Sequence, residues 1–254
     1  MINKLPKSLI ESAGKILHGN HIDMGIRSGR FSPVGHHIDM GIRGNGFRFY
    51  PSLVESIVDW AKGVGRGNFD EFDHLTREHE STLDDDEKNA VNAYTLNSDP
   101  IKDHIRSGNQ PDIVNVFHEG ENVYDVHLGH LDRAISKNKL KEPLVTYSGM
   151  QRSPWDNGHS MFHTATPMSS SLDPLVAHQF SISYGNDVAH IAKITNMKGS
   201  AGLLVGANKN LTPSPCEMEY IIPRNTNFVV HPEPEEVKGN NGKLTHYIWN
   251  MRRC

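Results

Sequence analysis

Two stretches of the sequence decide how the rest of the chain is interpreted. The first, residues 167–180, reads Pro-Met-Ser-Ser-Ser-Leu-Asp-Pro-Leu-Val-Ala-His-Gln-Phe. The second, residues 217–230, reads Glu-Met-Glu-Tyr-Ile-Ile-Pro-Arg-Asn-Thr-Asn-Phe-Val-Val. In the second stretch, two short apolar runs on either side of a turn-like Arg-Asn-Thr-Asn predict two strands. Because alternate side chains of a strand share a face, Glu217 and Glu219 are expected to point the same way.

This carboxylate pair favours a functional interpretation. Two neighbouring carboxylates repel each other, and the pKa of one of them can be raised. Such a pair suits a site that handles a cation and a proton. Taken alone, a Glu-x-Glu is also common on a solvated strand edge, and the serines 169–171 are also compatible with a loop before a helix. Asp173 fits the N-cap of that helix and Pro174 fits its first position.

Together and in this order, the two stretches resemble the mono-ADP-ribosyltransferases that carry an Arg…Ser-Thr-Ser…Glu-x-Glu signature. In that family a Ser-[Ser/Thr]-Ser run is followed by Leu-Asp-Pro and a helix with Ala and Phe. The Glu-x-Glu is followed by an apolar strand, a Pro, a turn and a Phe. The matching residues here are Ala177, Phe180, Pro223 and Phe228. Residues 83–95 look like the family's early helix, which ends in Tyr-Thr, and the resemblance covers roughly residues 70–254.

The order of the predicted elements is compatible with this resemblance. Helices are expected over residues 84–95, 99–107 and 122–137, and strands over residues 145–148, 162–166, 188–195, 203–205, 220–222, 228–230 and 244–249. Helices followed by strands predict an α+β fold. The resemblance implies a helical N-terminal part followed by a split two-sheet β core of the ADP-ribosyltransferase type, with an NAD cleft between the sheets.

The resemblance also implies a reaction, the transfer of ADP-ribose from NAD to an arginine side chain of a protein with release of nicotinamide. NAD is then a substrate, and no metal is expected. In this scheme Glu219 stabilises the oxocarbenium-like cation, and Ser169 holds Glu219 by a hydrogen bond. Glu217 takes the proton of the attacking guanidinium, which is a poor nucleophile while it is protonated.

One position departs from the family pattern. The family's first core strand usually ends in Tyr-Arg-Gly, whose Arg grips the NAD phosphates, whereas residues 147–149 here are Tyr-Ser-Gly. A serine hydroxyl carries no charge and cannot replace a bidentate guanidinium. NAD binding is then weaker, or its anchor lies elsewhere, for example at Arg152, or NAD is no longer used. The NAD-binding residues expected on the resemblance are Tyr147, Ser148, Gly149, Arg152, Ser170 and Ser171.

Three hypotheses about function therefore stay open. The first is the arginine-directed transferase. The second is an NAD glycohydrolase, in which water is the acceptor; Glu217 argues against it, because water needs no such selectivity. The third is a binding or virion structural protein with a decayed site on the same fold, for which Ser148 is the main argument.

The composition argues against several other classes of protein. The chain has 254 residues, of which 36% are hydrophobic, a formal net charge of -4 and a pI of about 6.5. This charge gives no reason to expect direct nucleic-acid binding. The two cysteines, Cys216 and Cys254, do not make a disulfide framework. No apolar run approaches the roughly 18 residues of a membrane span, and the first residues lack a secretion signal, so no membrane partner is expected.

Residues 1–69 are expected to form a helical and Gly-rich segment in front of a catalytic domain of residues 70–254. The sequence His-Ile-Asp-Met-Gly-Ile-Arg occurs in this segment twice, at residues 21–27 and 37–43, among many glycines that predict a loop or a hairpin of turns. No third ligand pattern supports a metal site on the repeated His and Asp, so a packing role is the better interpretation.

The front segment, the small size and the Tyr-Ser-Gly variant make the chain most similar to the Alt and Mod transferases of tailed phages. Those act on host proteins, so exposed arginines of host RNA polymerase or of translation proteins are the expected targets. The tripeptides at residues 9–11 and 53–55 resemble sites that phage prohead proteases cut. The expected location is the virion or the host cytoplasm, and a delivered bacterial effector is the alternative.

Overall fold

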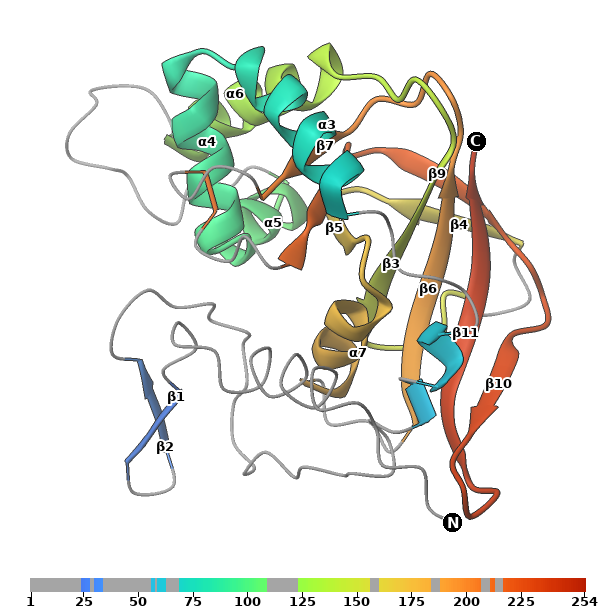
Figure 1. The fold of residues 1–254 in the computed structure, drawn as a ribbon. Coiled ribbons are helices and arrows are strands. Elements are labelled where there is room, and N and C mark those ends of the chain that lie inside the picture. The colour runs from blue at the N-terminus through green and yellow to red at the C-terminus, as the bar shows by residue number, and fades with distance from the viewer. Residues whose placement is uncertain are drawn as a thin grey trace. The chain divides into compact units, whose positions relative to one another are not determined.

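The chain divides into two units, Met1–Gly46 and Phe47–Cys254. The computed structural model describes residues 24–27, 30–33, 56–57, 59–62, 69–108, 123–155, 160–183, 188–206, 211–212 and 217–254 (Figure 1). In the first unit, β1 (Met24–Arg27) pairs antiparallel with β2 (Arg30–Pro33). The first His-Ile-Asp-Met-Gly-Ile-Arg copy therefore ends in a hairpin strand. The second copy lies outside the described residues.

In the described part of the second unit, four helices precede the large sheet from residue 69 onward. They are α3 (Phe69–Ser81), α4 (Asp85–Leu96), α5 (Asp99–Arg106) and α6 (Val123–Lys137). The helices predicted from the sequence correspond to α4, α5 and α6. Helix α4 begins with a capping box, in which the Asp84 carboxylate accepts from the Glu87 N–H at 2.8 Å and the Glu87 carboxylate accepts from the Asp84 N–H at 3.0 Å.

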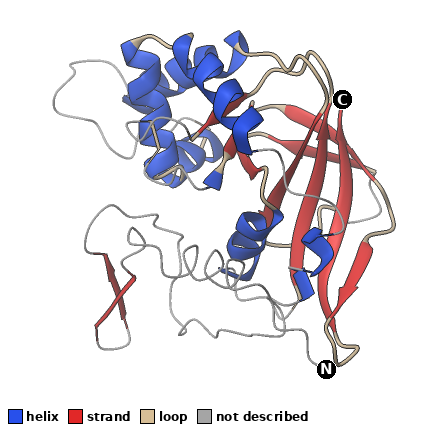
Figure 2. Cartoon of the chain, viewed as in Figure 1, coloured by secondary structure: helices blue, strands red, loops and turns tan. Residues whose placement is uncertain are grey.

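A mixed sheet follows these helices, and α7 (Pro174–Ser183), which lies between the fifth and sixth strands in chain order, packs beside it (Figure 2). Its strands are β3 (Leu144–Met150), β4 (Met161–Thr164), β5 (Met168–Ser171), β6 (Ala189–Asn196), β7 (Leu203–Val205), β8 (Glu219–Ile222), β9 (Thr226–Val230), β10 (Glu235–Lys238) and β11 (Leu244–Arg253). Their order is β4-β9-β11-β6-β3-β5-β8-β7, and β10 pairs with β11. Among the strands that the structure describes, only β6 and β11 pair in parallel.

The sheet is joined weakly in the middle. Strand β3 pairs with β6 along its whole length but with β5 only at Tyr147↔Ser171. The path thus falls into two parts, β4-β9-β11-β6-β3 and β5-β8-β7, which confirms the predicted α+β fold with a divided β core. The serine stretch forms β5, where the sequence was also compatible with a loop, and β10 was not predicted.

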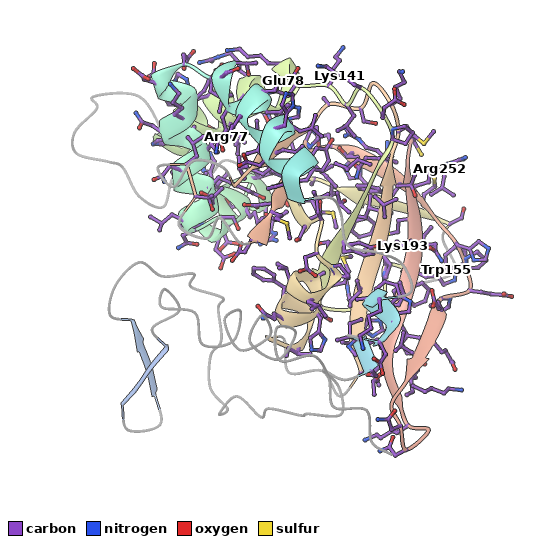
Figure 3. All side chains as sticks on the ribbon, in the orientation of Figure 1. Arg77, Glu78, Lys141, Trp155, Lys193 and Arg252 are labelled. Atoms are coloured by element: carbon purple, nitrogen blue, oxygen red, sulfur yellow. The ribbon has the colours of Figure 1, made fainter. Side chains whose placement is uncertain are left out.

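Two apolar clusters hold the second unit together. Strands β7 and β8 contribute to both of them, because their alternate side chains point to opposite faces. Leu204, Tyr220 and Ile222 face the cluster shared with β6, β9 and β11. Leu203 and Ile221 face the cluster shared with α4 and α6. Helix α3 also contacts the segment that precedes β3. Glu78 of α3 forms an ion pair of 2.6 Å with Lys141 of that segment (Figure 3).

The two units meet between Gly46 and Phe47, and the division into domains expected after residue 69 stays a prediction. The helical residues 56–57 and 59–62 pack within the second unit, where Ile57 and Ala61 are buried. Ser56 Oγ lies 2.9 Å from Thr245 Oγ1, and Trp60 Nε1 donates to Glu235 at 2.7 Å. Among the described helices, none is long and apolar enough to cross a bilayer.

Candidate active site

The pairing of β5 with β8 brings the serine stretch next to the second glutamate. Ser171 lies opposite Glu219 and Ser169 lies opposite Ile221 in the register. Residues that are opposite each other share a face of the sheet, as do residues two apart in one strand. Ser169, Ser171 and Glu219 therefore lie on one face, and the Ser169 hydroxyl hydrogen-bonds the Glu219 carboxylate. The structure thus joins the two residues that the resemblance pairs.

The Glu219 carboxylate is buried. Its side chain is 7% exposed, and burial raises its pKa above the ordinary value of a glutamate. Two interactions oppose that rise, the hydrogen bond from Ser169 and the charge of Lys102. A carboxylate in this setting lacks most of its hydration, so it interacts strongly with any positive charge that develops beside it.

Tyr94 supports Ser169 from helix α4. Its hydroxyl lies 3.1 Å from Ser169 Oγ and 3.2 Å from the Pro167 carbonyl oxygen, and its ring is buried. Burial is the main reason that the pKa of Tyr94 is raised, and the Glu219 charge adds to it. The Tyr94 hydroxyl has one proton, which it donates to the Pro167 carbonyl oxygen, and its oxygen contacts Ser169 Oγ. From the sequence, Tyr94 is expected only as a core residue of the early helix.

The other two serines of the stretch donate to backbone. Ser170 donates to the Tyr220 carbonyl at 2.9 Å, and Ser171 donates to the Glu217 carbonyl at 2.6 Å. Ser171 also accepts from the Asp173 N–H at 2.9 Å. Asp173 then accepts from the Leu175 N–H at 2.9 Å, which confirms it as the residue that caps α7. Ser171 thereby connects the start of α7 to the turn that carries Glu217.

Glu217 is not in the strand. Strand β8 begins at Glu219, and the intervening Met218 has a φ of 45°, in the left-handed region that a side chain rarely adopts. The prediction that strand alternation makes the two glutamates share a face is therefore wrong. A turn positions Glu217, and this turn is held by the Ser171 hydroxyl and by the Leu172 N–H, which donates to the Met218 carbonyl at 3.2 Å.

Strand β3 supplies the residues of the Tyr-Ser-Gly sequence. Ser148, in the family's arginine position, is buried, and its hydroxyl donates to the Ser169 carbonyl at 2.8 Å. This side-chain hydrogen bond therefore connects β3 to β5, two strands whose backbones pair only at Tyr147 and Ser171. Tyr147 is also buried, in an edge-to-face contact with Trp60 at 5.8 Å between ring centroids. Gly149 lies against the backbone of α7, and Arg152 is exposed after the strand.

Lys102 of α5 is a charged residue of the site that the sequence alone does not reveal. Its ammonium lies 5.5 Å from the centre of the Tyr94 ring. Burial lowers its pKa, and the charge of Glu219 is the largest interaction that opposes this. In a helix that begins at Asp99-Pro100, a lysine is normally expected on the solvated face, which is why sequence reasoning does not select it.

Comparison with known proteins identifies the fold. No protein-family model matches the sequence. Plx2a, an ADP-ribosyltransferase toxin from Paenibacillus larvae, matches with a TM-score of 0.53 and 16% identity over 80% of this chain and 96% of that one. C3stau2 from S. aureus, solved with NAD, matches with a TM-score of 0.54 and 17% identity over 74% of this chain and 96% of that one. The fold is that of the ADP-ribosyltransferase toxins.

Two further matches agree with the ADP-ribosyltransferase fold. The enzymatic component C2-I of the C2-toxin from Clostridium botulinum has a TM-score of 0.54 and 15% identity over 71% of this chain and 46% of that one. In sequence, the chain is 30% identical over 105 residues to the NAD(+)–arginine ADP-ribosyltransferase EFV of Enterococcus faecalis. That match covers 40% of this chain and 20% of the Enterococcus protein.

Proposed function

We propose that the chain is an NAD-dependent mono-ADP-ribosyltransferase that modifies arginine side chains of target proteins and releases nicotinamide. The observation that carries the proposal is the pair of Ser169 and Glu219, a buried carboxylate hydrogen-bonded across two adjacent strands. The toxin-like fold around this pair supports NAD as the substrate.

The proposed chemistry follows from the surroundings of Glu219. Breaking the bond between the ribose and nicotinamide leaves positive charge on the ribose, and a fixed carboxylate stabilises that charge where it develops. The low exposure of Glu219 strengthens this interaction, because little water screens it. Ser169 orients the carboxylate, and Tyr94 in turn orients Ser169.

Arginine is the proposed acceptor because of Glu217 and of the name of the sequence relative. Glu217 is partly exposed, on a turn that Ser171 holds directly before Glu219. In the proposed reaction its carboxylate takes the proton of the guanidinium that attacks the ribose. EFV of Enterococcus faecalis is named as an arginine-directed transferase.

The dinucleotide is proposed to lie against the ends of β3, β5 and β8. Tyr147, Ser148, Gly149, Ser170 and Ser171 are proposed to shape its site, and Arg152 to contact its phosphates. Because the hydroxyls of Ser148, Ser170 and Ser171 donate to carbonyls of the protein, the proposal gives these three a role in building the site. They retain lone pairs but have no second proton to donate to a phosphate.

The first experiment combines labelled NAD with a bacterial lysate and four proteins. Wild type is expected to label proteins, and the label is expected to be removed by hydroxylamine, as for an arginine linkage. Glu219→Gln is expected to abolish labelling and nicotinamide release, Glu217→Gln is expected to abolish labelling only, and the exposed control Glu233→Gln is expected to behave as wild type.

Each other outcome selects a different function. Nicotinamide release without labelling by wild type identifies an NAD glycohydrolase. Neither activity from wild type means that the site has lost NAD chemistry and that the protein is a binding or virion component. The proposal extends to a phage Alt/Mod-type transferase that acts on host RNA polymerase or translation proteins, on the basis of Tyr147-Ser148-Gly149. Mass spectrometry of the labelled lysate proteins tests those targets.

A further inference from the structure

Lys102 is a charge without a direct partner in the candidate site. In the described part of the chain it forms no ion pair, although Asp99 and Asp103 lie on the same helix. By contrast, Arg106, one turn further along α5, is exposed and pairs with Asp103 at 2.8 Å. Partial burial of an ammonium without an ion-pair partner costs free energy. This cost favours a functional role for Lys102.

We propose that Lys102 is the positioning residue that keeps the Glu219 carboxylate charged and holds it for the transfer reaction. This inference rests on the proposed function. Lys102 reaches the site from α5, and its ammonium lies over the ring of Tyr94 at 5.5 Å from the centroid. The Tyr94 hydroxyl contacts Ser169, and Ser169 contacts the Glu219 carboxylate. The lysine thus flanks the hydrogen-bonded chain that ends on Glu219.

The charges around Glu219 explain why a cation is needed there. Burial favours the protonated, neutral form of this carboxyl group. A neutral carboxylic acid would not stabilise a cationic transition state, so the reaction requires the charged form. Lys102 is the charged group that lowers the pKa of Glu219, and the charge of Glu219 in turn raises the pKa of Tyr94. Tyr94 stays neutral because burial raises its pKa, which leaves Lys102 to supply the positive charge.

The interaction is reciprocal. Burial disfavours the charge on Lys102 as well, and the groups that affect it are Glu219, Asp99, Arg106 and Asp103, with Glu219 the strongest of them. Each member of the pair therefore stabilises the charged form of the other. The family's arginine, whose position Ser148 occupies, binds the NAD phosphates. The role predicted for Lys102 is different, because it affects the protonation of the catalytic carboxylate and not the affinity for NAD.

A pH profile tests the proposal. The kcat of nicotinamide release is measured from about pH 5.5 to about pH 9 for wild type, Lys102→Met, Lys102→Arg and the control Lys88→Met. In Lys102→Met we expect kcat to fall about tenfold near pH 6 and to approach the wild-type value at the alkaline end. Lys102→Arg restores the profile, and Lys88→Met, which removes an exposed charge on α4, leaves it unchanged. An equal loss at every pH, or an increase in KM alone, overturns the proposal.

A stability measurement keeps the test independent of activity. Urea unfolding at neutral pH is compared for wild type, Lys102→Met, Glu219→Gln and the double variant. We expect the two substitutions to be coupled by about fivefold or more in the unfolding equilibrium constant, because each single variant leaves one buried charge alone. The pair Lys88→Met and Glu219→Gln is expected to be additive.

The two experiments together separate the inference from the proposed function. If wild type never turns over NAD but the coupling is present, the proposed function fails and the Lys102–Glu219 interaction stands. If wild type is active and the effects are additive, the inference fails alone.

Discussion

Tyr94 shows how one hydroxyl of a core residue can matter for the site. Replacing it by Phe keeps the buried ring and removes the hydroxyl that donates to the Pro167 carbonyl and contacts Ser169 Oγ. We expect Tyr94→Phe to lower the free energy of unfolding by about 1 kcal/mol and kcat by about three- to tenfold, with little change in KM. Steady-state kinetics of nicotinamide release measure this, with the half-buried Tyr247→Phe as control. Unchanged kcat in Tyr94→Phe would show that Ser169 is oriented without it.

Gly149 is required by close packing of β3 on α7. A Cβ at this position would lie 2.4 Å from the Ala177 carbonyl oxygen and 2.5 Å from the Ser181 nitrogen, both of which belong to backbone. We expect Gly149→Ala to lower the free energy of unfolding by about 1–3 kcal/mol, or to prevent folding. Gly129→Ala is the matched control, because a Cβ there meets nothing within 4 Å and alanine favours the helix. Equal stability of the two variants in urea would contradict the packing argument.

At the scale of elements, α7 and β11 meet at two buried histidines. His246 Nε2 lies 2.8 Å from His178 Nδ1, and His246 Nδ1 lies 2.9 Å from Thr245 Oγ1. Thr245 donates to the Val237 carbonyl, so His246 is the donor toward Thr245 and His178 is the donor toward His246. His178 Nε2 then keeps a lone pair with no partner among the described residues. Burial favours the neutral form of both rings.

This histidine pair predicts a pH-dependent stability. Burial lowers the pKa of His178 to about 4 and that of His246 to about 3, from the ordinary 6.5. As the pH falls below 6.5, the unfolded chain binds protons before the folded protein does, so stability is lost by about 1.4 kcal/mol for each pH unit and each proton, down to the folded pKa values.

The melting temperature between about pH 7.5 and about pH 4.5 measures this effect. His178→Met is expected to make the dependence less steep, because it removes one of the two groups, whereas His163→Met, on an exposed side chain, is expected to leave it unchanged. A melting temperature that stays constant down to the acid end would show that the pair is solvated or that it is charged in the folded protein.

At the scale of the whole molecule, the division after Gly46 predicts how the chain tolerates truncation. Removing residues 1–46 is expected to leave the second unit folded, because that unit contains its own core. Removing residues 1–68 also deletes Ile57, Trp60 and Ala61, and we expect it to lower the free energy of unfolding by at least about 3 kcal/mol. Urea unfolding of both fragments measures the difference. Equal stability would support the domain boundary expected after residue 69.

The elements with a clear pattern agree between sequence and structure. The amphipathic helices α4 and α6 lie where their periodicity predicts them. The apolar strands β6, β7 and β9 also lie close to the predicted ranges, because their apolar side chains are buried. Strand β5 did not stand out, since three serines have no apolar alternation and become a strand only through pairing with β8. Glu217 was predicted to lie on the strand because the apolar pattern continues up to it. Alternation alone cannot reveal that Met218 has a left-handed backbone, which ends the strand at Glu219.

The sequence by itself determined the order of the elements and the types of residue that the candidate site contains. It placed a serine stretch before a glutamate pair, put a capping residue before α7, and identified the family resemblance through those residues. Only the tertiary structure decided which side chains surround Glu219. Tyr94 and Ser169 are 75 residues apart in the chain, and Lys102 joins them from another helix. Such contacts depend on how helices pack against a sheet, and local patterns contain no information about that packing.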